Sequence, residues 1–276
     1  MENLVFLVKS YRNHIYWTKQ LMETIKIHNK DNIKVYLSIP QADIQLFNDN
    51  GDTSVCDIIS DEDVVKGTVH QNWYTQQLVK MKFSEMGLCK NYFWIDGDSY
   101  FIRDFYLSDF MYDEETPYTS IHENKDLFSW MAQTNQSLLD SVLLAYKGDR
   151  DKVRDIFGRK GKYYDWTCPN LWSVKVFEHM KKHYLEPNNL TYNQLLEYVP
   201  GELIWYGEYL LASQAIRIVP CEPWFKPFHY LEQMLDCRAH GNTEETLAKN
   251  YLGIVMPSNT GREYFANKQT SGDLRF

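Results

Sequence analysis

The segment NYFWIDGDSY, residues 91–100, brings two carboxylates to the end of an apolar run. The apolar run leads directly into Asp96, Gly97 and Asp98, which predicts a buried strand that ends at an acidic pair. Like charges this close repel each other, so the pair either faces solvent or has a neutralising partner. The elements on either side of the segment indicate which fold surrounds it.

Compact apolar runs of strand length alternate with amphipathic stretches over the first 110 residues. The strand patterns lie at 4–11, 33–39, 55–60 and 91–95, and the helical patterns lie at 14–28, 41–48 and 72–87. This order predicts an α/β fold with a parallel sheet covered by helices on both faces. Ligands of such sheets bind at the carboxyl ends of the strands, where Asp96 and Asp98 fall, as do Ser10 and Tyr11.

The second half of the chain is less regular. Helical patterns cover 127–146, 171–184 and 201–214, and a strand pattern covers 215–219. The charged stretch 147–166 contains several glycines and predicts an exposed loop. No repeat or linker is visible, so we expect one domain of residues 1–276 with two lobes, at about 1–110 and 111–276.

Composition excludes several classes of protein. The 29 Lys and Arg against 37 Asp and Glu give a formal charge of −8, which disfavours nucleic-acid binding. Five cysteines without a C-x-x-C pair argue against a disulfide framework or structural zinc and favour a reducing compartment. The N-terminus lacks the pattern of a signal peptide, and no run approaches the roughly 20 apolar residues of a membrane span. We expect a soluble, cytoplasmic protein.

The D-G-D segment has several chemical interpretations beside an ordinary solvated turn. A calcium loop of the EF-hand kind would need an oxygen ligand and a glycine where Tyr100 and Phe101 stand. A haloacid-dehalogenase-like phosphatase would use Asp96 as its nucleophile, but the stretch 148–155 lacks the second acidic motif expected of that family. The phosphatase therefore remains an alternative, and the EF-hand does not.

The third interpretation is a divalent metal clamp for a nucleotide diphosphate. Mg²⁺ and Mn²⁺ prefer oxygen ligands, which two carboxylates and a diphosphate supply. The cation would cancel the repulsion between Asp96 and Asp98 and stabilise charge on the leaving diphosphate. Gly97 would let the backbone pass close to the ligand.

The stretch NWYTQQLVKM, followed by YFWIDGDSYFIRDF, resembles the nucleotide-diphospho-sugar glycosyltransferases of the GT-A fold, which is Rossmann-like. In particular it resembles a bacterial family, long catalogued as a domain of unknown function, with a W-Y-x-Q-Q-x-x-K helix ahead of a D-x-D strand. LVKSYRNH and GELIWYGEY are similar to that family's first strand and acidic element. The likeness spans about residues 3–215 and is most specific over 71–105.

This resemblance implies that Asp96 and Asp98 bind Mn²⁺ or Mg²⁺ and, through the cation, the diphosphate. Enzymes of this fold often add a late histidine ligand, for which the candidates are His229 and His240, with His229 preferred. An ordinary surface or core position is the other interpretation of either histidine.

The resemblance also implies a nucleoside site at Ser10, Tyr11 and Arg12, where Tyr11 would stack on the base. Trp73, Gln77 and Lys80 share one helical face directed toward the same cleft, and Lys80 would contact phosphate or sugar. In the alternative interpretation, Trp73 packs in the core and Lys80 is exposed to solvent.

For an inverting transfer the resemblance implies a carboxylate base, Glu202, with Glu208 as second choice. In a retaining enzyme Glu202 would instead orient the acceptor. A helix start at Glu202 would keep its carboxylate ionised through the helix dipole.

The expected activity is transfer of a sugar, of hexosyltransferase type, from a UDP-sugar to a glycan or lipid-linked glycan acceptor. The lobe at about 1–110 would bind the nucleotide sugar and the lobe at about 111–276 the acceptor, in bacterial surface polysaccharide or lipopolysaccharide synthesis. The basic stretch 158–164 is either a solvated loop or a contact with such an acceptor or the inner face of a membrane. A sugar- or nucleotide-binding relative without turnover is the non-enzymatic alternative.

Overall fold

The computed structural model describes residues 1–67, 73–269 and 274–276. Its strands are β1 Glu2–Lys9, β2 Lys34–Ile39, β3 Asp57–Ser60, β4 Cys89–Asp96, β5 Ser99–Phe101, β6 Tyr118–Ser120, β7 Asn170–Ser173, β8 Val219–Cys221, β9 Phe225–Pro227 and β10 Gly253–Val255. Its α-helices are α1 Ile15–His28, α2 Ile44–Asn50, α3 Asp61–Val65, α4 Trp73–Lys82, α5 Lys125–Thr134, α6 Gln136–Phe157, α7 Val174–Met180, α8 Tyr192–Tyr198, α9 Glu202–Ser213, α10 Leu231–Ala239, α11 Glu244–Leu247 and α12 Arg262–Gln269.

A mostly parallel sheet forms the centre of the molecule. Its order is β3-β2-β1-β4-β7, and within it only β7 runs antiparallel to its neighbour. The prediction of an α/β fold with a mostly parallel sheet flanked by helices is therefore confirmed. The division into two lobes stays a prediction.

Each face of the central sheet has its own hydrophobic core. Alternate residues of β1 point to opposite faces: Phe6 packs with side chains of α1 and α2, and Leu7 packs with side chains of α4, α7 and α9. Strand β4 alternates in the same way, with Phe93 on the first face and Trp94 on the second. Burial on both faces explains why these strands read as continuous apolar runs.

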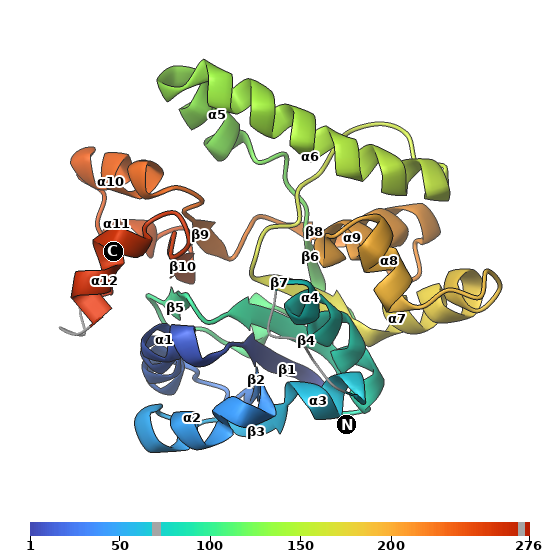
Figure 1. Ribbon diagram of the computed structural model, residues 1–276, viewed down its shortest axis with the longest axis horizontal. Coiled ribbons are helices and arrows are strands. Elements are labelled where there is room, and N and C mark those ends of the chain that lie inside the picture. The colour runs from blue at the N-terminus through green and yellow to red at the C-terminus, as the bar shows by residue number, and fades with distance from the viewer. Residues whose placement is uncertain (68–72, 270–273) are drawn as a thin grey trace.

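The remaining elements surround this sheet (Figure 1). Helices α5 and α6 lie at the top of the view, away from the sheet, and α10, α11 and α12 lie together at the left. Strand β5 leaves the central sheet directly after the acidic pair and joins a second sheet, ordered β5-β10-β9. The segment after Asp98 is thus tied to the last part of the chain.

Four predictions about the second half are wrong in detail, and three of them concern the type or extent of an element. Helix α6 continues through much of the predicted loop 147–166, where it buries Val153 together with Arg150 and Arg154, whose guanidinium groups donate to backbone carbonyls of the following loop. The predicted helix at 171–184 begins with strand β7, whose residues alternate between the two cores. The predicted strand at 215–219 contributes only its last residue to β8.

The predicted helix at 127–146 is divided at Asn135. The Asn135 side chain accepts a hydrogen bond from the backbone N–H of Leu138, which caps the start of α6 directly after the end of α5. A polar residue that can cap a helix thus separates two helices within one periodic pattern.

Candidate functional site

The acidic pair lies where the carboxyl ends of β1, β2 and β4 meet. Asp96 is the last residue of β4 and pairs in register with Lys9 at the end of β1. A cavity of about 400 Å³ opens at this edge of the sheet. Its lining includes Lys9, Tyr11, His14, Asp61, Trp73, Gln77, Lys80, Asp96, Gly97, Asp98, Asn259 and Arg262.

Lys80 is the cation that accompanies the acidic pair. Its Nζ lies 2.9 Å from Oδ1 of Asp96 and 3.3 Å from Oε1 of Glu202, and it sits 3.8 Å from the centroid of the Trp94 ring. Burial alone would lower the pKa of Lys80, but the charges of Asp96 and Glu202 outweigh burial and raise that pKa above its ordinary value. Lys80 is therefore charged over the whole ordinary pH range.

A second buried ion pair stands beside the first. Lys9 Nζ lies 2.9 Å from Oδ2 of Asp61, and Ser38 donates a hydrogen bond to the other oxygen of Asp61. Burial lowers the pKa of Lys9, and the nearby Asp61 charge offsets this only in part. The cavity thus has two buried lysines on one side, each already paired with carboxylate.

Asp98 is buried and held by the C-terminal part of the chain. The Ser258 hydroxyl donates to Oδ2 of Asp98, and the backbone N–H of Met256 donates to the Asp98 carbonyl oxygen over 2.9 Å. Burial raises the pKa of Asp98, with the charge of Asp96 adding to this and the nearby His14 opposing it. Burial of its carboxyl group is thus the main cause of the raised pKa of Asp98.

Gly97 is required by the close approach of β4 to α1. A Cβ at this position would lie 2.7 Å from the Thr18 hydroxyl oxygen and 3.0 Å from that of Ser10. Ser10 and Thr18 are hydrogen-bonded to each other, so neither side chain is free to move aside independently. Ser10 is thus part of the packing beneath the acidic pair.

The structure brings most of the other sequence-predicted binding residues together around the cavity. Tyr11, Trp73, Gln77 and Lys80 all line it, and the Trp73 side chain is 61% exposed. Arg12 instead forms an ion pair with Asp43 and lines a neighbouring hollow.

The two candidate bases occupy different positions on helix α9. Glu202 is buried beside Lys80 at the first turn, and Gln77 accepts a hydrogen bond from its backbone N–H. Glu208 lies on another face of the helix, where its completely buried carboxylate pairs with Arg159. Neither glutamate lines the cavity, and Glu208 lies apart from it.

Neither candidate histidine joins the acidic pair. His229 lines a separate cavity of about 360 Å³ together with His122, and burial lowers its pKa. His240 is exposed and lies beside Asp236. Within residues 1–67, 73–269 and 274–276, no group of three or more His, Cys, Asp or Glu side chains is placed to hold a metal ion.

Several residues of this site were not predicted from the sequence. Lys9 interrupts the first apolar run, which is a signal of a charged group at a strand end. Cys168, whose Sγ lies 3.3 Å from Oδ2 of Asp96, follows no recognisable motif. The same holds for Ser258, which bonds to Asp98, and for Arg262, which lines the cavity, both from the last part of the chain.

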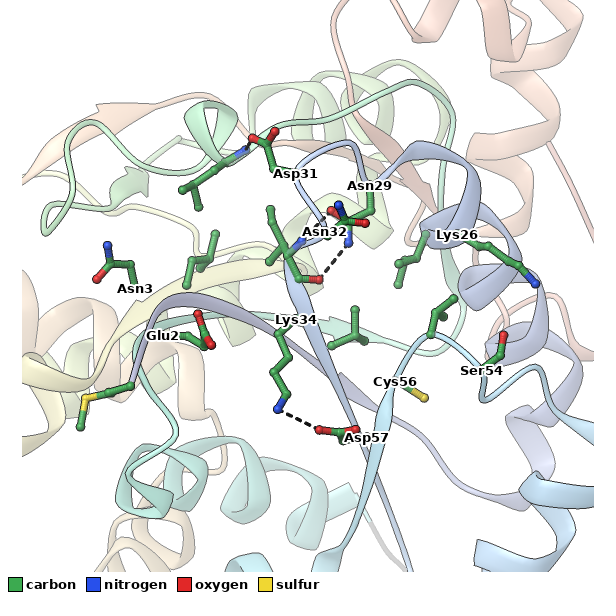
Figure 2. A pocket seen from close by; sticks show the side chains of 17 residues that line it. Glu2, Asn3, Lys26, Asn29, Asp31, Asn32, Lys34, Ser54, Cys56 and Asp57 are labelled. Carbon is green, nitrogen blue, oxygen red and sulfur yellow. Dashed lines mark hydrogen bonds and ion pairs between the residues drawn. The ribbon is translucent and has the colours of Figure 1, made fainter.

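A larger hollow of about 920 Å³ lies at the opposite, amino end of the strands (Figure 2). Its labelled polar side chains bond mostly with neighbours: Lys34 pairs with Asp57 at 2.9 Å, and Asn29 exchanges two hydrogen bonds with the backbone of Ile33. Charged groups do not converge there as they do around Asp96. The smaller cavity is the better candidate site.

Comparisons with known proteins do not identify the chain. No protein-family model and no curated protein matches it, so the resemblance to the bacterial glycosyltransferase family stays a prediction. The chain is similar to the crystal structure of apo mouse xyloside xylosyltransferase 1, with 8% identity and a TM-score of 0.49 over 94% of this chain and 99% of that chain. A similarity this distant does not establish a function. In the described part of the chain, none of the helices has the length and apolar character of a membrane span.

Proposed function

We propose that the protein is a metal-dependent glycosyltransferase of the GT-A type, which transfers a sugar from a nucleotide diphosphate donor to an acceptor hydroxyl. The acidic pair Asp96 and Asp98 at the end of a parallel strand, facing a cavity of about 400 Å³, is the observation that carries this proposal. Tyr11 and Trp73 line the same cavity and offer flat surfaces for a base or a sugar ring.

The acidic pair suits Mg²⁺ or Mn²⁺, because both cations prefer carboxylate oxygens. The Cys168 thiol is a weak donor to Oδ2 of Asp96, so this oxygen stays available to a cation. Asp96 and Asp98 would hold the cation, with diphosphate oxygens and water as its other ligands. When bound, such a cation neutralises charge on the leaving diphosphate.

The chain's own residues orient these groups. Lys80 fixes Asp96 through its ion pair, and Glu202 fixes Lys80 from the opposite side. Because Glu202 is buried and does not line the cavity, we assign it a positioning role through Lys80. Ser258 does the same for Asp98 through its hydroxyl.

The finer assignment rests on the sequence resemblance over residues 71–105. It comprises UDP as the nucleotide, a hexosyl-type transfer, and a glycan or lipid-linked glycan acceptor bound by residues of the 111–276 region. The proposed setting is bacterial surface polysaccharide or lipopolysaccharide synthesis.

A thermal-shift titration with UDP, with and without Mn²⁺, tests the site directly. A ligand that binds the native state raises the melting temperature by mass action. We expect UDP with Mn²⁺ to stabilise the wild-type protein and to have little effect on Asp98→Asn. Asp126→Asn is the matched control, because Asp126 is an exposed carboxylate that lines the other cavity. Equal shifts in wild type and Asp98→Asn would place the nucleotide elsewhere.

An activity assay separates the alternatives. Release of UDP from a panel of UDP-hexoses, lost in Asp96→Asn, is the result expected of a transferase. Hydrolysis of p-nitrophenyl phosphate, lost in the same variant, would instead identify a phosphatase with Asp96 as nucleophile. Binding of UDP without turnover on any UDP-hexose would favour a non-catalytic relative.

A further inference from the structure

The positively charged side chains that line the cavity differ in whether they form an ion pair with a carboxylate. Lys9 is paired with Asp61, and Lys80 is shared between Asp96 and Glu202, so neither lysine offers an uncompensated charge. Arg262 lines the same cavity and is exposed to solvent. Its guanidinium donates to the Asn259 side-chain oxygen over 3.3 Å, and no carboxylate of a described residue lies within ion-pair distance.

Arg262 is anchored relative to the acidic pair. It is the first residue of α12 and follows a segment that is bonded to Asp98 at two points, through Met256 and Ser258. The backbone N–H of Gly261 donates to the Pro257 carbonyl oxygen over 2.8 Å, which makes this connection a compact turn. The backbone that carries Arg262 is therefore held by the same contacts that orient Asp98.

The balance of charges at the site shows that a bound diphosphate would need one more positively charged group. The charge of a divalent cation is cancelled by Asp96 and Asp98, and Lys80 is cancelled by Glu202. The negative charge of a diphosphate would then face a site with no net positive charge from these groups. Guanidinium groups bind phosphate oxygens by paired N–H donors, and Arg262 is free to do so.

We propose that Arg262 binds the diphosphate of the donor and makes the site selective for nucleoside diphosphates over the corresponding monophosphate and nucleoside. This role rests on the proposed function, since it requires a nucleotide in the cavity. Tyr11 and Asp98 line the same cavity as Arg262.

Calorimetric titration of the full chain with Mn²⁺ and UDP, UMP, uridine or inorganic pyrophosphate tests the role. Removal of a charge-assisted contact predicts UDP and pyrophosphate affinities about 10- to 100-fold weaker in Arg262→Gln. Uridine affinity should stay within about twofold, because uridine lacks the phosphates that Arg262 binds. Arg262→Lys keeps the charge and should recover part of the UDP affinity.

Arg275→Gln is the matched control, because Arg275 is exposed near Glu244 and does not line the cavity. Unchanged UDP and pyrophosphate affinity in Arg262→Gln would overturn the role of Arg262, as would an equal loss in Arg275→Gln. If the wild-type protein bound neither UDP nor pyrophosphate with Mn²⁺, the proposed function itself would fail, and the role of Arg262 with it.

Discussion

Replacement of Lys80 by methionine should strongly destabilise the protein. The two ion pairs, at 2.9 and 3.3 Å, each correspond to a gross attraction of about 5–6 kcal/mol at an effective dielectric constant of about 20. Desolvation of the buried ammonium group opposes this attraction. Removal of one partner from a buried pair therefore lowers the free energy of unfolding by about 3–5 kcal/mol. Partial exposure of Asp96, at 30% of its side chain, moves the expectation toward the lower value.

Urea unfolding followed by circular dichroism measures this loss, because tryptophan fluorescence would also report the change beside Trp94. Lys82→Met is the control on the same helix: Lys82 donates to a backbone carbonyl and lies near no carboxylate in the described ion pairs, so about 1 kcal/mol is expected. The double variant Lys80→Met/Glu202→Gln should recover part of the loss, because it removes one of the two stranded carboxylates. A loss below about 1 kcal/mol in Lys80→Met would refute the description of Lys80 as the buried cation of the site.

Further predictions concern packing, metal binding and pH. Gly97→Ala should lower the free energy of unfolding by about 1–3 kcal/mol, since its Cβ would collide with a threonine hydroxyl. Gly148→Ala, in an open position of helix α6, should raise it by about 0.5–1 kcal/mol, and urea unfolding checks both variants. Ser258→Ala should weaken Mn²⁺-dependent UDP binding about tenfold in calorimetry, because Asp98 loses the donor that orients it. Burial lowers the pKa of His122 below 6.5, so the unfolded state takes up its proton first as pH falls. The stability should thus be complete above pH 6.5 and decline below it, by at most about 1.4 kcal/mol per pH unit, and His122→Gln should flatten the decline in unfolding measurements across pH 5–7.

The elements that could be predicted from the sequence are those whose burial is uniform. Strands β1 and β4 are apolar on both faces, and their predicted positions agree with the structure to within two residues. The acidic pair follows β4 directly, so its place at the edge of the sheet follows from local order alone. The failed predictions concern amphipathic or mixed segments, such as α6, where buried Arg150 and Arg154 donate to backbone carbonyls of the following loop.

Lys80, Glu202 and Asp98 were predicted as site residues, but their contacts, which join distant segments, were not. Lys80 and Glu202 are 122 residues apart, and Asp98 and Ser258 are 160 residues apart. Neither pair follows from periodicity, because the folded topology alone brings the partners together. The need for a neutralising group beside Asp96 could be stated from electrostatics, but its identity as Lys80 could not.

Strand β5 begins at Ser99, directly after the acidic pair, and its antiparallel partner β10 begins at Gly253. The pairing of β5 with β10 therefore joins the early and late portions of the chain directly beside the two carboxylates. The first part of the chain therefore cannot be separated from the last part without loss of contacts at the site. A fragment that ends near residue 110 would contain Asp96 and Asp98 but would lack strand β10 and Ser258, which bonds to Asp98. A chimaera that exchanges the later part of the chain would have to retain residues 253–262 together with residues 1–110.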